Sequence, residues 1–166
     1  MAASFYLDAS ALAKRYVPET GSPLIDEILD KVPGVRIYVL NVGTGEVVSI
    51  LVRKKNAGVI SAAYFGQALL DFEAEVVRSA DINKLPVGNR LATSALALIV
   101  AHSINSTDAI ILKSALAIAQ KLRAGGGDLV LVASDQRLLH AAQLEGLVTF
   151  NPESQDQAAL TALLGP

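Results

Sequence analysis

The chain has 166 residues, 52% of them hydrophobic and 18% charged, a balance typical of a folded domain with a buried core and not of a disordered segment. It has no cysteine, which excludes a disulfide framework and a thiolate metal site and fits a reducing compartment. A net charge of −2 excludes a general nucleic-acid coat protein but is compatible with a nuclease that has a local basic patch.

The first half of the chain alternates short apolar runs with amphipathic segments. Two runs have the composition and length of strands: Ser4–Leu7 and Val35–Leu40. Four segments have helical periodicity or helix boundary signals: Ser10–Val17, which Pro18 interrupts, Ser22–Lys31, Gly45–Asn56 and Ser61–Glu75.

The second half continues this alternation. The apolar pair Val76-Val77 is a weak strand candidate, whereas two later runs are stronger: Leu129–Ala133 and Leu147–Phe150. Helices are expected in three segments: Val87–Ser103, Thr107–Leu122 and Gln136–Leu144. The tail, residues 155–164, is either a final short helix or a frayed end. Because no linker or repeat interrupts the alternation, we expect one α/β domain over residues 1–166, with a central parallel sheet of four to five strands between helical layers.

Neither a leader nor a membrane span is visible. The start, Met1-Ala2-Ala3-Ser4, lacks the basic and long apolar segments of a secretory signal. The most apolar stretch, from Leu91 to Ile104, is too short and too polar to cross a bilayer. We therefore expect a soluble, cytoplasmic protein.

Four acidic residues follow strands or begin helices in this pattern: Asp8, Glu46, Asp108 and Asp135. If the sheet is parallel, the carboxyl ends of its strands meet at one edge, and these side chains can converge there. Clustered carboxylates repel one another, and a hard divalent ion such as Mg²⁺ or Mn²⁺ relieves that repulsion. The alternative for each acid alone is ordinary helix capping, which is the commoner use of Asp at such positions.

Three segments resemble the motifs of the PIN-domain family over nearly the whole chain, from about Phe5 to Pro152. The opening Tyr6-Leu7-Asp8-Ala9-Ser10 is similar to the start of that family, and Ser106-Thr107-Asp108-Ala109 resembles its Asp-Ala helix. The run from Leu129 to Leu139, which contains Ser134-Asp135, resembles its last acidic motif. Glu46 resembles the acid of its second motif, although the preceding Asn41-Val42-Gly43-Thr44-Gly45 is richer in glycine than the family pattern.

The resemblance implies a Rossmann-like three-layer sandwich and a Mg²⁺- or Mn²⁺-dependent ribonuclease. Many PIN domains are VapC-type toxins of type II toxin–antitoxin modules, which form dimers and are neutralised by a small antitoxin protein. By resemblance, the metal-binding and catalytic acids are Asp8, Glu46, Asp108 and Asp135, and Ser10 and Thr107 are hydroxyl residues beside them that position substrate. Five basic residues are candidates for RNA phosphate contacts, and a solvated helix face is the equally weighted alternative: Lys14, Arg15, Arg53, Lys54 and Lys55.

Other functions fit less well. The segment Gly43-Thr44-Gly45 half-matches a dinucleotide-binding fingerprint, but Val48 stands where the third glycine belongs. A receiver domain needs adjacent acids after its first strand, and these are absent. Neither His102 nor His140 has a second histidine at metal-binding spacing. A catalytically silent PIN-like domain that binds RNA or a protein remains the alternative to the enzyme.

Overall fold

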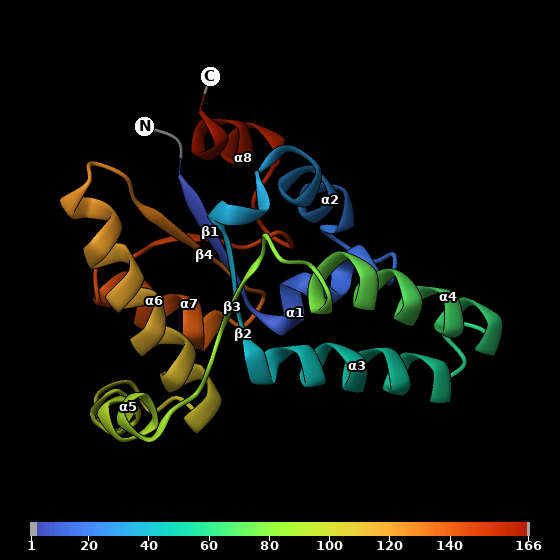
Figure 1. Cartoon of the computed structure of the whole chain (residues 1–166), viewed down its shortest axis with the longest axis horizontal. Helices are drawn as coiled ribbons and strands as arrows, with labels where there is room; N and C mark the ends of the chain where they lie inside the picture. Colours follow the sequence, from blue (N-terminus) through green and yellow to red (C-terminus); the bar gives the residue numbers. More distant parts are fainter. Residues whose placement is uncertain (1–2, 166) are drawn as a thin grey trace.

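A central parallel sheet organises the computed structural model, which describes residues 3–165 (Figure 1). Within this range five strands lie in the order β3-β2-β1-β4-β5, and each neighbouring pair is parallel. The strands are β1 Ser4–Leu7, β2 Ile37–Leu40, β3 Asn83–Leu85, β4 Leu129–Val132 and β5 Val148–Phe150. The predicted α/β class with a parallel sheet of four to five strands is confirmed.

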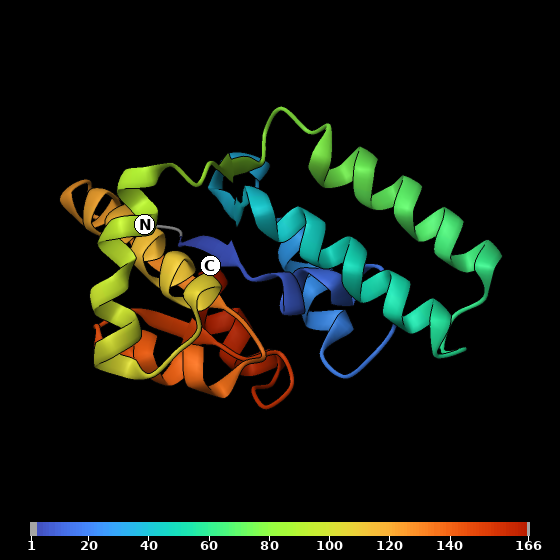
Figure 2. The same ribbon diagram turned by 90° about the horizontal axis from the view of Figure 1, so that it is seen from below.

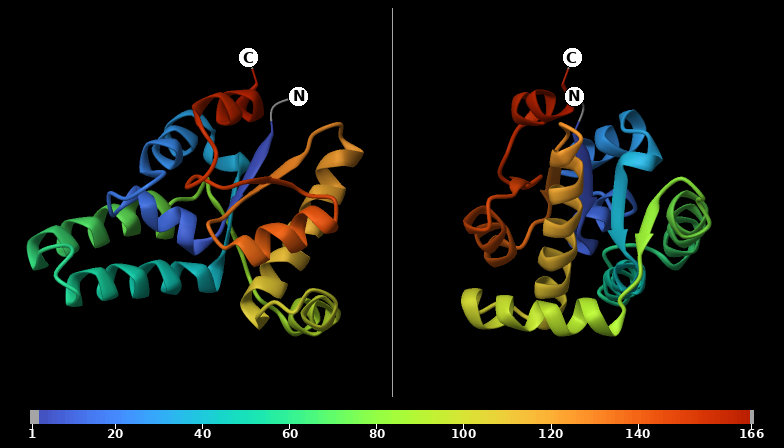
Figure 3. Two further views of the ribbon diagram at one scale, coloured as in Figure 1. Left: turned by 180° about the vertical axis from the view of Figure 1, so that it is seen from behind. Right: turned by 60° about the vertical axis from the view of Figure 1, so that its left-hand side comes forward.

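Helices cover both faces of this sheet (Figures 1 and 3). On one face lie α1 Ala9–Leu12, α2 Ser22–Lys31, α3 Asn41–Asn56, α4 Ala62–Phe72 and α8 Gln157–Leu164. On the other face lie α5 Asn89–His102, α6 Ser106–Ala124 and α7 Gln136–Leu144. Helices α3 and α4 run side by side and extend outward from the sheet as a helical pair (Figure 2). The molecule is therefore a three-layer sandwich with a projecting arm.

The neighbouring strands β1 and β4 are apolar apart from Ser4, because both of their faces are covered. Successive side chains of a strand point to opposite faces. Phe5 and Leu7 of β1 accordingly belong to the core under α1 to α4, while Tyr6 belongs to the core under α5 to α7. In β4, Val130 and Leu131 divide in the same way. This two-sided burial explains why both strands appear in the sequence as continuous apolar runs.

The position of the third strand differs from the sequence prediction. The pair Val76-Val77 does not form a strand, because it ends a π-helical turn, Glu73–Val77, that continues α4. The strand lies instead at Asn83–Leu85, where it pairs with β2 at the sheet edge. The Asn83 side chain donates hydrogen bonds to the carbonyls of Val35 and Ile37, both at 3.0 Å. A half-buried edge strand lacks the apolar pattern by which central strands are predicted.

The start of α3 differs as well. This helix begins at Asn41, directly after β2, and not at Gly45. The glycine-rich segment is therefore helical, and the Thr44 hydroxyl donates to the Asn41 carbonyl at 2.7 Å within it. Glu46 consequently lies in the second turn of a longer helix.

The tail forms a helix. In α8 the Asp156 side chain accepts a hydrogen bond from the Ala159 N–H at 2.9 Å, and Leu160 is buried against the sheet. Met1, Ala2 and Pro166, which belong to the expected 1–166 domain, lie outside the described residues. None of the described helices is by itself long and apolar enough to cross a bilayer, although α5 and α6 together, bent by 109° at their junction, pass by length and composition.

The direction in which successive strands are added to the sheet reverses between β1 and β4. The chain moves outward from β1 through β2 to β3, then returns to the other side of β1 for β4 and β5. In open α/β sheets, ligands bind in the crevice beyond the carboxyl ends of the strands at such a reversal. Asp8 directly follows β1, and Asp135 follows β4 at the start of α7.

Candidate active site

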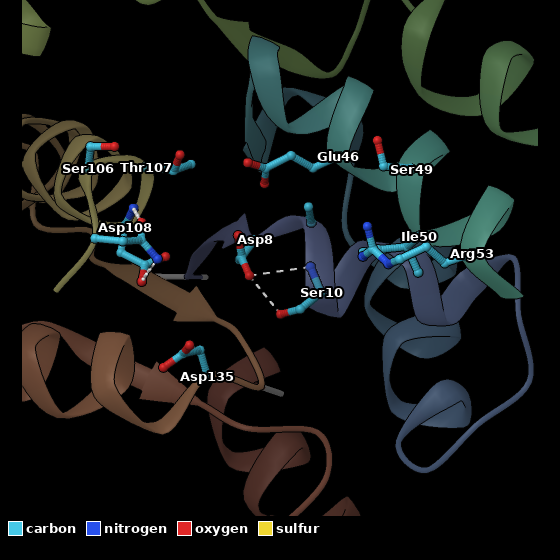
Figure 4. Close-up of a pocket in the computed structure, with 12 residues that line it drawn as sticks. Asp8, Ser10, Glu46, Ser49, Ile50, Arg53, Ser106, Thr107, Asp108 and Asp135 are labelled. Carbon is cyan, nitrogen blue, oxygen red and sulfur yellow. Dashed lines mark hydrogen bonds between the residues drawn. The ribbon is translucent and has the colours of Figure 1, made fainter.

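Four carboxylates from four different helices line one cavity at this reversal point. Its volume is about 570 Å³, and Figure 4 shows the acids grouped around it. Asp8 caps α1, Glu46 projects from α3, Asp108 lies in the first turn of α6 and Asp135 caps α7. The fold thus brings together the four acids that the sequence analysis selected.

Asp8 is fixed by its neighbour Ser10. The Ser10 hydroxyl donates to Asp8 Oδ2 at 2.6 Å, and the Ser10 N–H donates to the same oxygen at 3.3 Å. The Ser10 Oγ also accepts the N–H of Ser134 at 3.3 Å. Ser10 therefore links the end of β1 to the end of β4 at the floor of the cavity.

Asp135 combines a capping role with a position in the site. Its Oδ1 accepts the N–H groups of Arg137 at 2.8 Å and Leu138 at 3.2 Å, which is ordinary N-terminal capping. Among the described residues no donor contacts its Oδ2, and the residue lines the cavity. Capping and ligand binding are therefore not exclusive here, since each can use a different oxygen.

Asp108 is held by Asn105, which the sequence analysis did not identify. Asn105 Nδ2 donates to Asp108 Oδ2 at 2.7 Å, and the Asp108 N–H donates to Asn105 Oδ1 at 2.8 Å. The spacing of a capping residue followed three positions later by an acid is a readable signal for such an arrangement.

The cavity places negative charges close together. The pKa of Asp108 is raised to about 6, first by burial and then by the charges of Asp135 and Asp8. Burial also raises the pKa of Glu46, and the Asp8 charge adds to this effect while Arg53 opposes it. A divalent cation among these groups would reverse the upward shifts, because it favours the ionised carboxylates.

The donor set suits a hydrated hard cation. The described residues that line the cavity offer carboxylate, hydroxyl and amide oxygens and no sulfur or imidazole ligand. In the described part of the chain, no three Asp, Glu or His side chains converge closely enough to hold an ion by direct contact alone. Mg²⁺ usually keeps several waters and binds through one or two carboxylates, so the arrangement fits an ion held partly through water.

The predicted basic residues occupy different places. Arg53 lines the cavity on the α3 side, near Glu46 (Figure 4). Lys14 is buried with 2% of its side chain exposed and forms salt bridges with Glu19 at 2.9 Å and Glu153 at 2.6 Å. Arg15 forms salt bridges with three carboxylates, those of Asp26, Asp30 and Glu75. Neither Lys14 nor Arg15 lines the cavity, and their charges are already neutralised within the protein.

Of the remaining lining residues, one was predicted from the sequence and the others were not. The predicted Thr107 lines the cavity together with Ser106, and α3 adds Ser49 and Ile50. Arg137 lies near enough to Asp108 for its charge to lower the pKa of that carboxyl against the effect of burial. Polar and apolar residues on exposed helix turns look alike in sequence whether or not a cavity lies beside them.

Comparisons with known proteins agree with this architecture. A model of the PIN domain family matches residues 5–144. The structure of PAE2754 from Pyrobaculum aerophilum is similar, with a TM-score of 0.60 at 19% identity over 98% of both chains. FitAcB from Neisseria gonorrhoeae has a TM-score of 0.58 at 16% identity over 91% of this chain and 99% of that one. VapC20 from Mycobacterium tuberculosis, a sarcin-ricin loop cleaving toxin, has a TM-score of 0.59 at 18% identity over 92% of this chain and 100% of that one. A search of curated proteins found no match.

Proposed function

This chain belongs to the PIN-domain family, and from that premise we propose that it is an endoribonuclease that depends on Mg²⁺ or Mn²⁺. The observation that carries the proposal is the convergence of Asp8, Glu46, Asp108 and Asp135 on one cavity at the reversal of the sheet. Family membership alone gives the fold, whereas the acidic cavity supplies the chemistry that a metal-dependent nuclease needs.

The roles of the residues follow from their positions. When bound, a divalent ion supplies Lewis acidity toward a phosphodiester and activates water for attack on phosphorus. The four acids would hold the ion, partly through water, and Ser10 and Asn105 fix the carboxylates of Asp8 and Asp108. Arg53 and Thr107 lie on the cavity wall, where they can contact phosphate oxygens of the RNA.

We extend the proposal to a biological role. The similarity in fold to VapC20, which is a toxin, supports the proposal that this protein is the toxin of a toxin–antitoxin pair. In that role the protein is a cytoplasmic homodimer of single PIN-like domains, each spanning residues 1–166, and a small antitoxin protein neutralises it.

A catalytically silent PIN-like domain that binds RNA or protein is the second candidate. The observation in its favour is that, within the described residues, no three acidic side chains reach one point directly. The two candidates differ in metal-dependent cleavage, so one experiment separates them.

The test is cleavage of a mixed single-stranded RNA pool by the purified protein. We expect cleavage with Mn²⁺, loss of cleavage with a chelator and recovery when Mn²⁺ is added back. Asp8→Asn should abolish cleavage while the thermal unfolding curve stays cooperative. Asp156→Asn, the same change at the cap of α8, is the matched control and should cleave normally. Full activity of Asp8→Asn at saturating Mn²⁺ would remove Asp8 from the site, and no cleavage by the unaltered protein under any metal would favour the silent domain.

A further inference from the structure

A second cavity lies beside the acidic one, between the end of α5 and helix α7. Its volume is about 280 Å³, and its polar lining comes from His102, Ser103, Arg137 and His140. Ser103 precedes Asn105 of the acidic cavity by two residues, and Arg137 follows Asp135 by two residues. The same loop and the same helix start therefore contribute to both cavities, which makes them neighbours along one surface.

Arg137 lines the second cavity and, within the described part of the chain, has no carboxylate partner. Within residues 3–165 no carboxylate lies at salt-bridge distance from its guanidinium, in contrast to Lys14, Arg15 and Arg123. Its charge nevertheless acts on Asp108 in the acidic cavity. An unpaired arginine beside a phosphodiester-cleaving site is available for a phosphate of the same strand.

The rest of the second cavity offers apolar surface beside this charge. Arg137, His140 and Leu144 are spaced three and four residues apart, so they share one face of α7. Leu144 is 65% exposed, and Ala101 of α5 lines the same cavity. On the same wall His102 Nε2 is bonded to Glu145 Oε1 at 2.7 Å, so that carboxylate already has a partner. A cationic group next to exposed apolar surface matches a nucleotide, whose phosphate is charged and whose base has an apolar face.

We propose that the cavity between α5 and α7 is a second RNA subsite, which binds the nucleotide next to the scissile phosphodiester. The phosphate of that nucleotide contacts Arg137 and His140, and its base lies against Leu144 and Ala101. The proposal rests on the proposed nuclease function for the identity of its ligand. It assigns substrate binding to residues outside the acidic cavity.

The first test measures binding separately from cleavage. In an Asp8→Asn background with Mg²⁺ present, the affinity for a fluorescent single-stranded oligoribonucleotide is measured by anisotropy. We expect Arg137→Ala to weaken binding about 10-fold, which is the typical loss for one good phosphate contact. Leu144→Ala should weaken binding about 3-fold, since part of a base contact is lost.

A matched control excludes a general effect of charge. Lys121 is exposed in the last turns of α6, and 13 residues separate it from Asp108 in the first turn. At the helical rise this places it roughly 20 Å from the acidic cavity. Lys121→Ala should change the affinity by less than about 2-fold. If Arg137→Ala and Lys121→Ala reduced the RNA affinity equally, the proposed subsite would be overturned.

The second test uses substrate length. In the otherwise unaltered protein, Arg137→Ala should lower kcat/KM more for a longer oligoribonucleotide than for a dinucleotide, because only the longer strand reaches the second cavity. If the protein cleaves RNA but Arg137→Ala binds and cleaves like the unaltered protein, the subsite is overturned and the nuclease stands. If the protein cleaves no RNA but Arg137→Ala still weakens RNA binding selectively, the nuclease is overturned and the RNA site stands.

Discussion

Asn105 and Asp108 form two reciprocal hydrogen bonds at the start of α6, where Asn105 is the N-cap. The Asn105 amide donates to Asp108 Oδ2 at 2.7 Å, and the Asp108 N–H donates to Asn105 Oδ1 at 2.8 Å. The Asn105 side chain thus caps the N-terminus of α6 and also holds the Asp108 carboxylate of the acidic cavity in place. The two roles use different atoms of Asn105 and can be separated by substitution.

Asn105→Ser should weaken metal binding without unfolding the helix. Serine keeps an oxygen for the Asp108 N–H but lacks the amide donor to the carboxylate. We expect the free energy of unfolding to change by less than about 0.5 kcal/mol, since Ser and Asn are similar caps. The apparent Mn²⁺ affinity, measured by calorimetry, should fall about 10-fold, as for other residues that orient a metal ligand.

Ser61→Ala is the control for the capping role. Ser61 accepts the Tyr64 N–H at the start of α4 and does not line the acidic cavity. This change should lower the free energy of unfolding by about 1 kcal/mol and leave Mn²⁺ affinity unchanged. An Asn105→Ser protein that binds Mn²⁺ like the unaltered one would show that the amide donor does not matter.

Asp108→Asn should stabilise the metal-free protein at neutral pH. Its pKa is about 6 in the folded state, against about 3.9 for an ordinary Asp. Because the pKa is raised in the folded state, ionisation of Asp108 is less favourable there than in the unfolded chain. The free energy of unfolding therefore falls as the pH rises from about 4 to about 6. Removing the charge of this buried carboxyl should raise the free energy of unfolding at pH 7 by about 1–3 kcal/mol, since each pKa unit corresponds to about 1.4 kcal/mol.

Urea unfolding in the presence of a chelator measures this effect. The gain should vanish near pH 4, about where the carboxyl is protonated in both states. Asp156→Asn keeps a good cap and should show no gain at either pH. An Asp108→Asn protein less stable at pH 7 than the unaltered chain would contradict repulsion within the cavity.

Ser10→Ala should impair cleavage through Asp8. The hydroxyl donates to Asp8 Oδ2 at 2.6 Å and accepts the Ser134 N–H at 3.3 Å, so its loss frees the carboxylate. We expect kcat/KM for RNA to fall about 10-fold to 100-fold, with partial recovery in Ser10→Thr. Ser94→Ala removes a hydroxyl that donates to the Leu91 carbonyl in α5, away from the acidic cavity, and should have no effect. Equal activity of the Ser10→Ala and Ser94→Ala proteins would exclude a positioning role.

Lys14→Met should change stability and not RNA binding. Burial lowers the pKa of Lys14, but its bonds to Glu153 and Glu19 outweigh this effect and raise the pKa. Breaking this buried ion pair should lower the free energy of unfolding by about 2 kcal/mol. RNA affinity of the folded protein should stay unchanged, whereas Arg53→Ala should weaken RNA binding with little effect on stability. A selective loss of RNA binding in Lys14→Met would return Lys14 to the list of RNA contacts.

Strands and helices were predictable where burial leaves a regular pattern of apolar residues in the sequence. β1 and β4 are apolar apart from Ser4 because helices cover both faces, and α2 has its apolar residues at helical spacing. The edge strand Asn83–Leu85 was not predictable, because it is half-buried. Backbone hydrogen bonds to β2 and the Asn83 side chain hold it in the sheet, and neither requires an apolar pattern. The start of α3 was misjudged because glycine disfavours helices on average, while the packing of α3 on the core overrides that preference.

The sequence by itself determined the chemistry that this protein can offer. It set carboxylates at the ends of apolar strands and at the starts of helices, and these positions follow from local hydrogen bonding and periodicity. Only the tertiary structure decided which side chains share a cavity. The strand order brought Asp8, Asp108 and Asp135 together across more than 120 residues of chain. It also buried Lys14 and left Arg137 without a carboxylate partner among the described residues. Such pairings depend on contacts between distant segments, which no local pattern encodes.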